Sequence, residues 1–585
     1  MSAVNERHGG SIIADVLARH GVKHLFTLCG GHISPILTGA EARGIKVVDV
    51  RDEGHAVFAA DAAARMTGIV GVAAVTAGPG VTNTVTALKN AQMAQTPLLL
   101  FGGATATLLK GRGSLQDIDQ LSIMKPLTKW ATSVSTVPAL ASTVERAIHV
   151  ATSGVPGPVF IEVPVDLLYP ESQIRAMYAK EVGLGKAKGL SARALELYVR
   201  GHLYRQFNAP VLPDLSLPEV RLPTLRSAGD GLAAAARALR AAERPVIVVG
   251  AQTTVGLRDP ERVARALRDL GAPVYLAGSA RGLLGRHDPL QFRHARTPAL
   301  KEADCVVVCG FPFDFRLGYG RSIKKGATVI TANLSAAEMK KNRRPEIAVE
   351  LHPADFLAAL AAQAGGDGGR WPTWFETLRG RERARDEEIA KKAAPAGELI
   401  DPIHFFLRME EQMADDAILV VDGGDFVATA SYIVRPRAPL SWLDPGVFGT
   451  LGVGGGFAVG AAATRPGKEI WLVWGDGSSA YSLSEFDTFV RHGHAPIAVI
   501  GNDASWAQIA REQVEMLGSA LGTELRRTDY HRVAEGYGGV GLVLTDPTKV
   551  DSTLAEARAL ARSGKPVCLN VHLRPTDFRK GSISI

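Results

Sequence analysis

Short apolar runs of strand length recur along this chain, and Ala-rich stretches with helical periodicity separate them. Early examples are the runs Lys23–Leu28 and Val159–Val163 and the helical stretch Ala56–Thr67. Such alternation is typical of βαβ units around a parallel sheet. The pattern restarts near Ser227 and again near Ile400. We therefore expect an α/β protein of three consecutive doubly wound, Rossmann-like domains.

Changes in composition set the expected boundaries. Prolines 210, 213, 218 and 223 interrupt the pattern, and a Gly-rich run with Trp371-Pro372 marks a second break. We expect a first domain over 1–180, a linker or partly helical connection over 181–225, a central domain over 226–370, a linker helix over 371–399, a third domain over 400–573 and a C-terminal segment over 574–585.

Two turns of the third domain carry oxygen side chains. The run Ile470–Trp474 leads into Gly475-Asp476-Gly477, and a second apolar run ends at Asn502-Asp503 about one crossover later. The carboxyl ends of parallel strands meet at one edge of a sheet, and glycines before a helix let backbone N–H groups approach an anion. Mg²⁺ binds one or two carboxylates together with phosphate oxygens. One such turn alone favours an ordinary surface turn, but the pair predicts a Mg²⁺–diphosphate site.

The charge balance narrows the class of partner. The 66 Lys and Arg residues exceed the 59 Asp and Glu by seven, but they are spread along the chain without a basic tail. Nucleic acid is therefore not an expected partner, and small phosphorylated molecules are. No apolar stretch reaches membrane-spanning length, and the first ten residues lack the apolar core of a signal peptide, so we expect a cytosolic protein without a membrane partner.

Taken together, several motifs resemble the thiamine-diphosphate-dependent enzymes of the acetolactate synthase and oxalyl-CoA decarboxylase type. Besides the two turns, they are Arg-Asp-Glu-Gly-His-Ala at 51–56, Ala-Gly-Pro-Gly-Val-Thr-Asn at 77–83 and Leu-Gln-Asp-Ile-Asp at 115–119. The resemblance covers nearly the whole chain and implies pyrimidine-binding, central and diphosphate-binding domains in that order. It also implies that different subunits share each cofactor, so we expect at least a homodimer, with a tetramer favoured.

The resemblance implies a role for several single residues. Glu53 would contact the aminopyrimidine of thiamine diphosphate and exchange a proton with it; the alternative is a carboxylate stabilised at a helix N-terminus. Asp476, Asp503 and the carbonyl of Ser505 would hold Mg²⁺, although most relatives have asparagine where Asp503 stands. The remaining expected cofactor contacts are Gly30, Gly31, Gly78, Asn83, Gly423, Gly424, Asp425, Gly449, Leu451, Gly475, Gly477, Ser478 and Ser479, among which Leu451 would bend the cofactor or else be a plain core leucine.

Three further segments resemble the 2-hydroxyacyl-CoA lyase branch of these enzymes, namely 28–35, 501–506 and 577–582. The resemblance implies reversible cleavage of a 2-hydroxyacyl-CoA, such as 2-hydroxyisobutyryl-CoA, to formyl-CoA and a ketone or aldehyde. Acetolactate synthase-type joining of 2-keto acids, oxalyl-CoA decarboxylation and a catalytically idle regulatory paralogue are the alternatives. Candidates for contacting the substrate hydroxyl are His32, Gln116, Gln508 and Glu512, of which the two glutamines can only orient it.

The resemblance also suggests where the acyl-CoA is held. The segment from residue 574 would close over it as a lid, with Arg579 and Lys580 contacting phosphates; a frayed terminus is the alternative. In the central domain, Gln252, Arg281 and Asn333 are candidate nucleotide contacts, for example to ADP. Many relatives have aspartate where Asn333 stands, so a purely structural central domain is an equal alternative.

Overall fold

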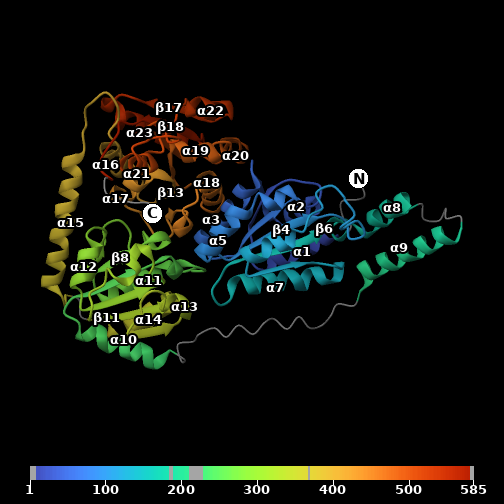
Figure 1. Cartoon of the computed structure of the whole chain (residues 1–585), viewed down its shortest axis with the longest axis horizontal. Helices are drawn as coiled ribbons and strands as arrows, with labels where there is room; N and C mark the ends of the chain where they lie inside the picture. The colour runs from blue at the N-terminus through green and yellow to red at the C-terminus, as the bar shows by residue number, and fades with distance from the viewer. Residues whose placement is uncertain (1–7, 183–188, 210–227, 367–368, 580–585) are drawn as a thin grey trace. The chain divides into compact units, whose positions relative to one another are not determined.

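The computed structural model describes residues 8–182, 189–209, 228–366 and 369–579, and these fall into two compact units. The first unit covers Met1–Ala64 and Ile69–Val220, and the second covers Arg65–Gly68 and Arg221–Ile585, as far as each is described. Figure 1 shows the helices and strands of both units. Of the segment expected to form the lid, residues 574–579 are described, and Lys580 and the residues after it lie outside the described residues.

The first unit is built on a six-stranded parallel sheet with the order β2-β1-β3-β4-β6-β5. Its three central strands are buried at every position, as a parallel sheet covered on both faces requires. The strands are β1 (His24–Leu28), β2 (Lys46–Asp49), β3 (Gly71–Val75), β4 (Leu98–Ala104), β5 (Trp130–Ser133) and β6 (Pro158–Pro164), and the helices are α1 (Gly9–Arg19), α2 (Ser34–Glu41), α3 (Glu53–Thr67), α4 (Pro79–Thr82), α5 (Val85–Ala94), α6 (Gln120–Met124), α7 (Leu140–Thr152), α8 (Glu171–Val182) and α9 (Leu190–Asn208).

The start of the expected linker is an ordered helix. Helix α9 has 19 residues, and the buried Asp166 holds it and α8 against the first sheet. The Asp166 carboxylate accepts hydrogen bonds from the Tyr178 hydroxyl at 2.9 Å and the Thr107 hydroxyl at 2.6 Å, and its backbone carbonyl accepts one from Gln206 at 2.8 Å. The chain after Asn208 therefore leaves from a helix that is docked on the first domain, while residues 210–227 lie outside the description.

The central domain has its own parallel sheet, with the order β12-β11-β10-β7-β8-β9. Cys305 and Cys309 are buried in its middle strand, where burial raises the pKa of both thiols. The strands are β7 (Pro245–Val249), β8 (Val274–Leu276), β9 (Gln291–Phe292), β10 (Cys305–Cys309), β11 (Thr328–Asn333) and β12 (Ile347–Glu350), and the helices are α10 (Gly229–Ala241), α11 (Pro260–Leu270), α12 (Arg296–Glu302), α13 (Ala336–Met339) and α14 (Pro353–Ala364).

The third domain repeats the plan with the strand order β14-β13-β15-β16-β18-β17, again all parallel. Its strands are β13 (Ile418–Asp422), β14 (Trp442–Leu443), β15 (Ile470–Gly475), β16 (Ile497–Asn502), β17 (Val540–Leu544) and β18 (Val567–His572), and its helices are α16 (Pro402–Gln412), α17 (Gly424–Ile433), α18 (Val453–Thr464), α19 (Asp476–Ser482), α20 (Glu485–His492), α21 (Ala507–Leu517), α22 (Tyr530–Gly536) and α23 (Val550–Arg562). None of the helices in the described part of the chain is long and apolar enough to cross a membrane.

Helix α15 (Pro372–Lys392) connects the cores of the central and third domains, as Figure 1 shows. Its first turns bury Trp374 and Leu378 in the core of the central domain, whereas Ile389 near its other end packs into the core of the third domain. One helix that contributes to both cores restricts how the two domains can move relative to each other.

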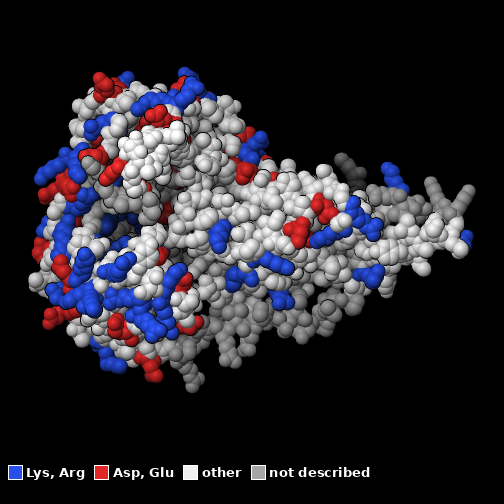
Figure 2. All heavy atoms as spheres, in the orientation of Figure 1, with Lys and Arg blue, Asp and Glu red and all other residues white. Residues whose placement is uncertain are grey.

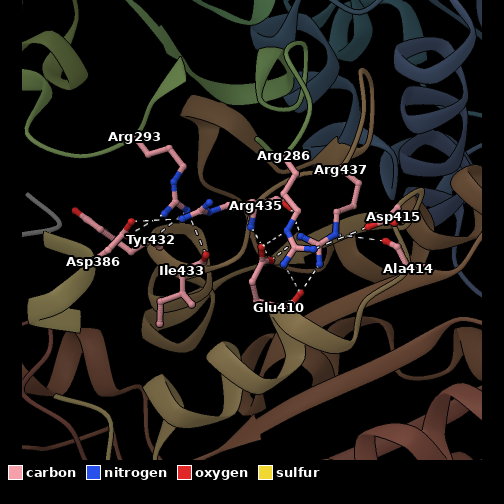
Figure 3. Close-up of polar contacts among 10 residues, drawn as sticks. All are labelled: Arg286, Arg293, Asp386, Glu410, Ala414, Asp415, Tyr432, Ile433, Arg435 and Arg437. Atoms are coloured by element: carbon pink, nitrogen blue, oxygen red, sulfur yellow. Dashed lines mark hydrogen bonds and ion pairs between the residues drawn. The ribbon is translucent and has the colours of Figure 1, made fainter. Parts of the chain in front are cut away.

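A buried carboxylate joins the same two domains (Figure 3). Glu410 of α16 accepts hydrogen bonds at 3.0 Å from Arg286 of the central domain and at 2.7 Å from Arg437, whose side chain is fully buried. The backbone N–H of Arg435 donates to the same carboxylate at 3.0 Å. A second cluster lies beside it, in which Arg293 of the central domain pairs with Asp386 of α15 at 3.3 Å. Both clusters fix the central domain against the third.

We predict that Glu410→Gln destabilises the protein strongly. The change keeps the shape of the side chain but leaves the buried Arg437 guanidinium without its counter-charge, and breaking one partner of a buried pair costs about 3 kcal/mol or more. Differential scanning calorimetry should show a clear loss in Tm. The matched control is Glu376→Gln, which breaks an exposed pair with Arg383 and should leave Tm unchanged. Equal Tm values for the two variants would contradict the role of Glu410 in connecting the central and third domains.

Candidate active site

Glu53, the expected proton-exchange residue, is the first residue of α3 and lies at the carboxyl edge of the first sheet. It is 8% exposed, and one of its carboxylate oxygens accepts a hydrogen bond from the Asn83 side chain at 2.9 Å. A Cβ at Gly80 would lie 3.5 Å from its other oxygen. The helix start and the Gly78–Asn83 turn therefore come together, and a buried carboxylate is oriented by one amide.

Gln116 and His32 lie at the same edge of this sheet. A Cβ at Gly78 would be 2.9 Å from both Cβ and the carbonyl oxygen of Gln116, so the two backbones touch. The half-buried His32 contacts the Thr76 hydroxyl through Nδ1 at 3.2 Å, and burial lowers its pKa. His32 is therefore neutral at pH 7 and able to accept a proton. Gly30, beside it, packs directly on Thr76.

The second unit contains a cavity of about 1080 Å³ at the carboxyl ends of β13, β15 and β16. Asp476 and Asp503 from the two predicted turns line it, together with Ser505. Most of the expected diphosphate contacts line the same cavity, namely Gly423, Gly424, Asp425, Gly449, Leu451, Gly475, Gly477 and Ser478. Ser479 is fully buried behind it, where its hydroxyl donates to the Asp476 carbonyl at 2.8 Å.

The two carboxylates create a strongly negative point. Burial raises the pKa of Asp476 to about 6, and burial together with the charge of Asp476 raises that of Asp503 to about 7. Oδ2 of Asp476 is buried and accepts no hydrogen bond. A cation between these groups would remove the repulsion and satisfy the bare oxygen. Two carboxylates and one carbonyl leave the remaining ligands to phosphate and water, which is the donor set that Mg²⁺ uses.

Glycines shape the floor of the cavity. At Gly423, where φ is +72°, a Cβ would lie 2.3 Å from Cδ2 of Leu451. At Gly477 it would lie 2.5 Å from the ring of Trp506. Both positions are therefore too tight for a residue with a Cβ, and glycine-rich helix starts of this kind fit a diphosphate. Leu451 packs directly on the Gly423 turn, in the place expected of a residue that shapes the cofactor.

Asp425 takes part in a different interaction from the one expected. Its carboxylate pairs with Arg511 of α21 at 2.6 Å, and Arg579 approaches it at 3.9 Å. Arg511 also donates to the Arg579 carbonyl at 2.8 Å. Asp425 therefore anchors the C-terminal segment, and Arg574 anchors its beginning through the buried Asp401 at 2.5 Å. These contacts hold residues 574–579 against the third domain, and Arg579 lines the cavity.

Two of the proposed nucleotide contacts, Gln252 and Asn333, do not line this cavity. Gln252 is buried, and its side-chain oxygen accepts from the Leu334 N–H at 2.8 Å. Asn333, equally buried, accepts from the Ser335 N–H at 2.8 Å. Both side chains satisfy backbone groups at the ends of the central strands. Glu512 lies one turn beyond Gln508 on α21, and of these two Gln508 lines the large cavity.

A second cavity of about 690 Å³ adjoins the first and shares Arg281, Arg296, Ser431 and Arg579 with it. Five arginines line it, and none of the described lining residues is acidic; they are Arg281, Arg293, Arg296, Arg385 and Arg579. Burial above all, together with neighbouring guanidinia, lowers the pKa of Arg281, Arg293 and Arg296. Figure 2 shows Lys and Arg side chains inside a hollow of this unit. The cavity is suited to a polyanion.

The fold and these sites define the class of protein. Family models of the thiamine pyrophosphate enzymes match the chain in three places: the N-terminal thiamine-pyrophosphate-binding domain over residues 7–123, the central domain over 232–360 and the C-terminal thiamine-pyrophosphate-binding domain over 422–571. The chain belongs to this family, and it carries both cofactor-binding domains in addition to the residues described above.

Full-length relatives place the chain within the family. It is 47% identical to 2-hydroxyacyl-CoA lyase 2 of Danio rerio over 99% of this chain and 94% of the relative, and 47% identical to the Homo sapiens protein of the same name over 99% and 92%. It is 33% identical to an acetolactate synthase large subunit of Mycobacterium tuberculosis, over 97% and 96%. The lyases are thus markedly more similar to it than this synthase.

Sequence reasoning did not find Trp506 or the arginines at 293, 296 and 385. It also missed Gln120, which accepts from the Gly78 N–H, and Glu162, which accepts from Gln120. The arginines come from separate segments, so no local pattern connects them. Glu162 did leave a signal, because it is a charged residue inside the otherwise apolar run Pro158–Pro164. A charge in the middle of a buried strand is seldom tolerated without a partner.

We predict that Gly477→Ala weakens thiamine diphosphate binding about tenfold or more. The new Cβ would overlap the Trp506 ring, and accommodating an extra methyl group in a packed site costs about 1–3 kcal/mol. Isothermal titration calorimetry with Mg²⁺ present measures the affinity. The control is Gly380→Ala on α15, where a Cβ meets nothing within 4 Å and the affinity should not change. Equal affinities in the two variants would show that Gly477 is not part of the diphosphate site.

Proposed function

We propose that this protein is a thiamine-diphosphate-dependent lyase that reversibly cleaves 2-hydroxyacyl-CoA thioesters to formyl-CoA and a ketone or aldehyde. The observation that carries the proposal is the arginine-lined cavity beside the diphosphate site. The nucleotide of coenzyme A carries several phosphates that five guanidinia can bind, whereas a 2-keto acid is a small monocarboxylate. The similarity to 2-hydroxyacyl-CoA lyases supports the same substrate class.

The residues that would hold the cofactor are divided between the two units. Thiamine diphosphate supplies, when bound, the carbon nucleophile that attacks the thioester carbonyl. Glu53, oriented by Asn83, would hold and return a proton at the pyrimidine. Asp476, Asp503 and the Ser505 carbonyl would hold Mg²⁺, which would neutralise charge on the diphosphate. We propose that two subunits together complete each site, which requires at least a dimer and favours a tetramer.

Cleavage of the carbon–carbon bond also requires a base that removes the proton of the 2-hydroxyl group. His32 is the better placed of the two candidate bases, because it is neutral at pH 7 and lies at the same sheet edge as Glu53. Gln116 would orient the hydroxyl group. Glu512 lies outside the lining of the large cavity, which argues for the supporting role of a relay. We also propose that the central domain is structural and contributes Arg281 to the nucleotide of the substrate in place of binding separate ADP.

We predict that Glu53→Gln lowers turnover of 2-hydroxyisobutyryl-CoA about a thousandfold, because an amide cannot exchange the proton. Thiamine diphosphate affinity, measured by calorimetry, should stay within a factor of about three, since the side-chain volume is kept. Products are identified by mass spectrometry, with oxalyl-CoA and pyruvate as rival substrates. Acetolactate from pyruvate, with no formyl-CoA from any thioester in the wild type, would reject the proposed function.

We predict that Arg385→Met raises the KM for 2-hydroxyisobutyryl-CoA about tenfold, the loss expected for one charge-assisted hydrogen bond. The KM for the corresponding pantetheine thioester, which lacks the nucleotide, should be the same in wild type and variant. Arg383→Met is the matched control, because Arg383 lies on the same helix and pairs with Glu376 at the surface. A proportional rise in KM for both thioesters would show that the cavity does not bind the nucleotide.

A further inference from the structure

We infer that Lys110, Glu162 and Gln120 form a positioning network that holds Gln116 and the Gly78 turn in the geometry needed for turnover. The inference rests on the proposed function, because Gln116 and the neighbours of Glu53 are its candidate site residues. Lys110 and Gln116 belong to the same loop between β4 and α6, and Glu162 lies on β6 beneath that loop. Lys110, Glu162 and Gln120 are not among the residues expected to contact the cofactor.

The network begins with a charge in an unfavourable place. Glu162 is 1% exposed, and every residue of β6 is buried. One carboxylate oxygen accepts from the Lys110 ammonium group and from the Ser133 hydroxyl at 2.8 Å. The other accepts from the Gln120 amide at 3.0 Å. A buried carboxylate is tolerated only with this degree of pairing, so removing one partner is costly.

Gln120 links Glu162 to the backbone of Gly103 and Gly78. Its side chain, 1% exposed, donates to the Gly103 carbonyl at 3.1 Å and accepts from the Gly78 N–H at 2.8 Å. Gly78 has a φ of +63°, which glycine adopts readily, and its backbone touches Gln116. A Cβ at Gly103 would lie 2.5 Å from Cβ of His32. One amide thus fixes two backbone positions that Gln116 and His32 pack against.

The backbone of Gln116 shows why it needs support. Its φ is +63°, a region that a residue with a Cβ occupies only when the surroundings over-determine it. The loop around it is largely exposed, and Leu115, the residue just before it, is 81% exposed. Thr107, in the same loop, is held by Asp166, and the Gly111 N–H donates to Asp117 at an exposed position. The Lys110–Glu162 pair fixes the loop near its beginning, and Gln120 fixes it after Gln116.

Stability alone does not account for such a pair. Glu162 is buried but the Lys110 side chain is 42% exposed, so the main cost of losing Lys110 is that of a buried carboxylate without its counter-charge. Replacing both partners by uncharged residues removes that cost. A pair that serves only to stabilise would therefore be replaceable, and a positioning pair would not. This difference separates the two roles experimentally.

The experiment compares Lys110→Met, Lys110→Arg and the double variant Lys110→Met/Glu162→Gln in the full-length enzyme. Lys110→Met should lower Tm and lower kcat for 2-hydroxyisobutyryl-CoA about tenfold to a hundredfold, with KM nearly unchanged, because a misplaced group near the reaction costs rate. Lys110→Arg keeps the charge and should restore most of kcat. The double variant should regain Tm but not kcat. Lys89→Met, on α5 of the same domain, is the control and should retain kcat.

Hydrogen–deuterium exchange of residues 106–118 in the free enzyme gives a readout that needs no substrate. Exchange should be faster in Lys110→Met and in the double variant than in the wild type. Recovery of kcat together with Tm in the double variant, or unchanged exchange, would overturn the inference. If the wild type cleaves no thioester while exchange follows the expected pattern, the proposed function fails and the network stands.

Discussion

The cavities of this protein depend on the joint between the central and third domains. Both cavities are lined by residues from the two domains, so their shape exists only while those domains hold one relative position. Glu410 with Arg286 and Arg437 supplies a buried, directional contact at that joint, and α15 adds apolar packing into each core. Directional contacts of this kind set an angle between domains, which apolar packing alone does less well.

This joint between the domains places a cavity with two carboxylates next to a cavity lined by arginines. The larger cavity contains Asp476 and Asp503, whose mutual repulsion and burial favour a bound cation. Five arginines line the adjoining cavity and none of its described lining residues is acidic, although Arg293 and Arg579 also contact Asp386 and Asp425. A metal-bound diphosphate would match the charge of the larger cavity, and a separate polyphosphate would match that of the arginine-lined cavity. Arg281 and Arg579 line both cavities, so the two ligands would lie close to each other.

The interior strands could be predicted from sequence, as could the edge strand β2 from the run Lys46–Val50, but the other edge strands could not. Runs such as Cys305–Cys309 are apolar throughout because both faces of the strand are covered. In contrast, β5 (Trp130–Ser133) is only half-buried, and β9 and β14 have two residues each, so no periodicity marks them. The turns at Asp476 and Asp503 were predictable because strand ends and glycines are local signals. The arginine cavity was not, because it forms only when separate segments of the chain meet.

The two adjoining cavities have a consequence for catalysis. A nucleotide held in the arginine-lined cavity would take no part in the reaction itself, and binding energy from such non-reacting parts of a substrate can hold the reacting group in place. That use requires rigid walls, and the segment 574–579 is fixed by Asp401, Asp425 and Arg511. It also requires that the groups on the other unit be held equally firmly. Gln116 lies on an exposed loop with a positive φ, and the contacts that support this loop include Lys110–Glu162 and Gln120–Gly78. Rigidity of the wall and support of the loop are therefore two parts of one condition for turnover.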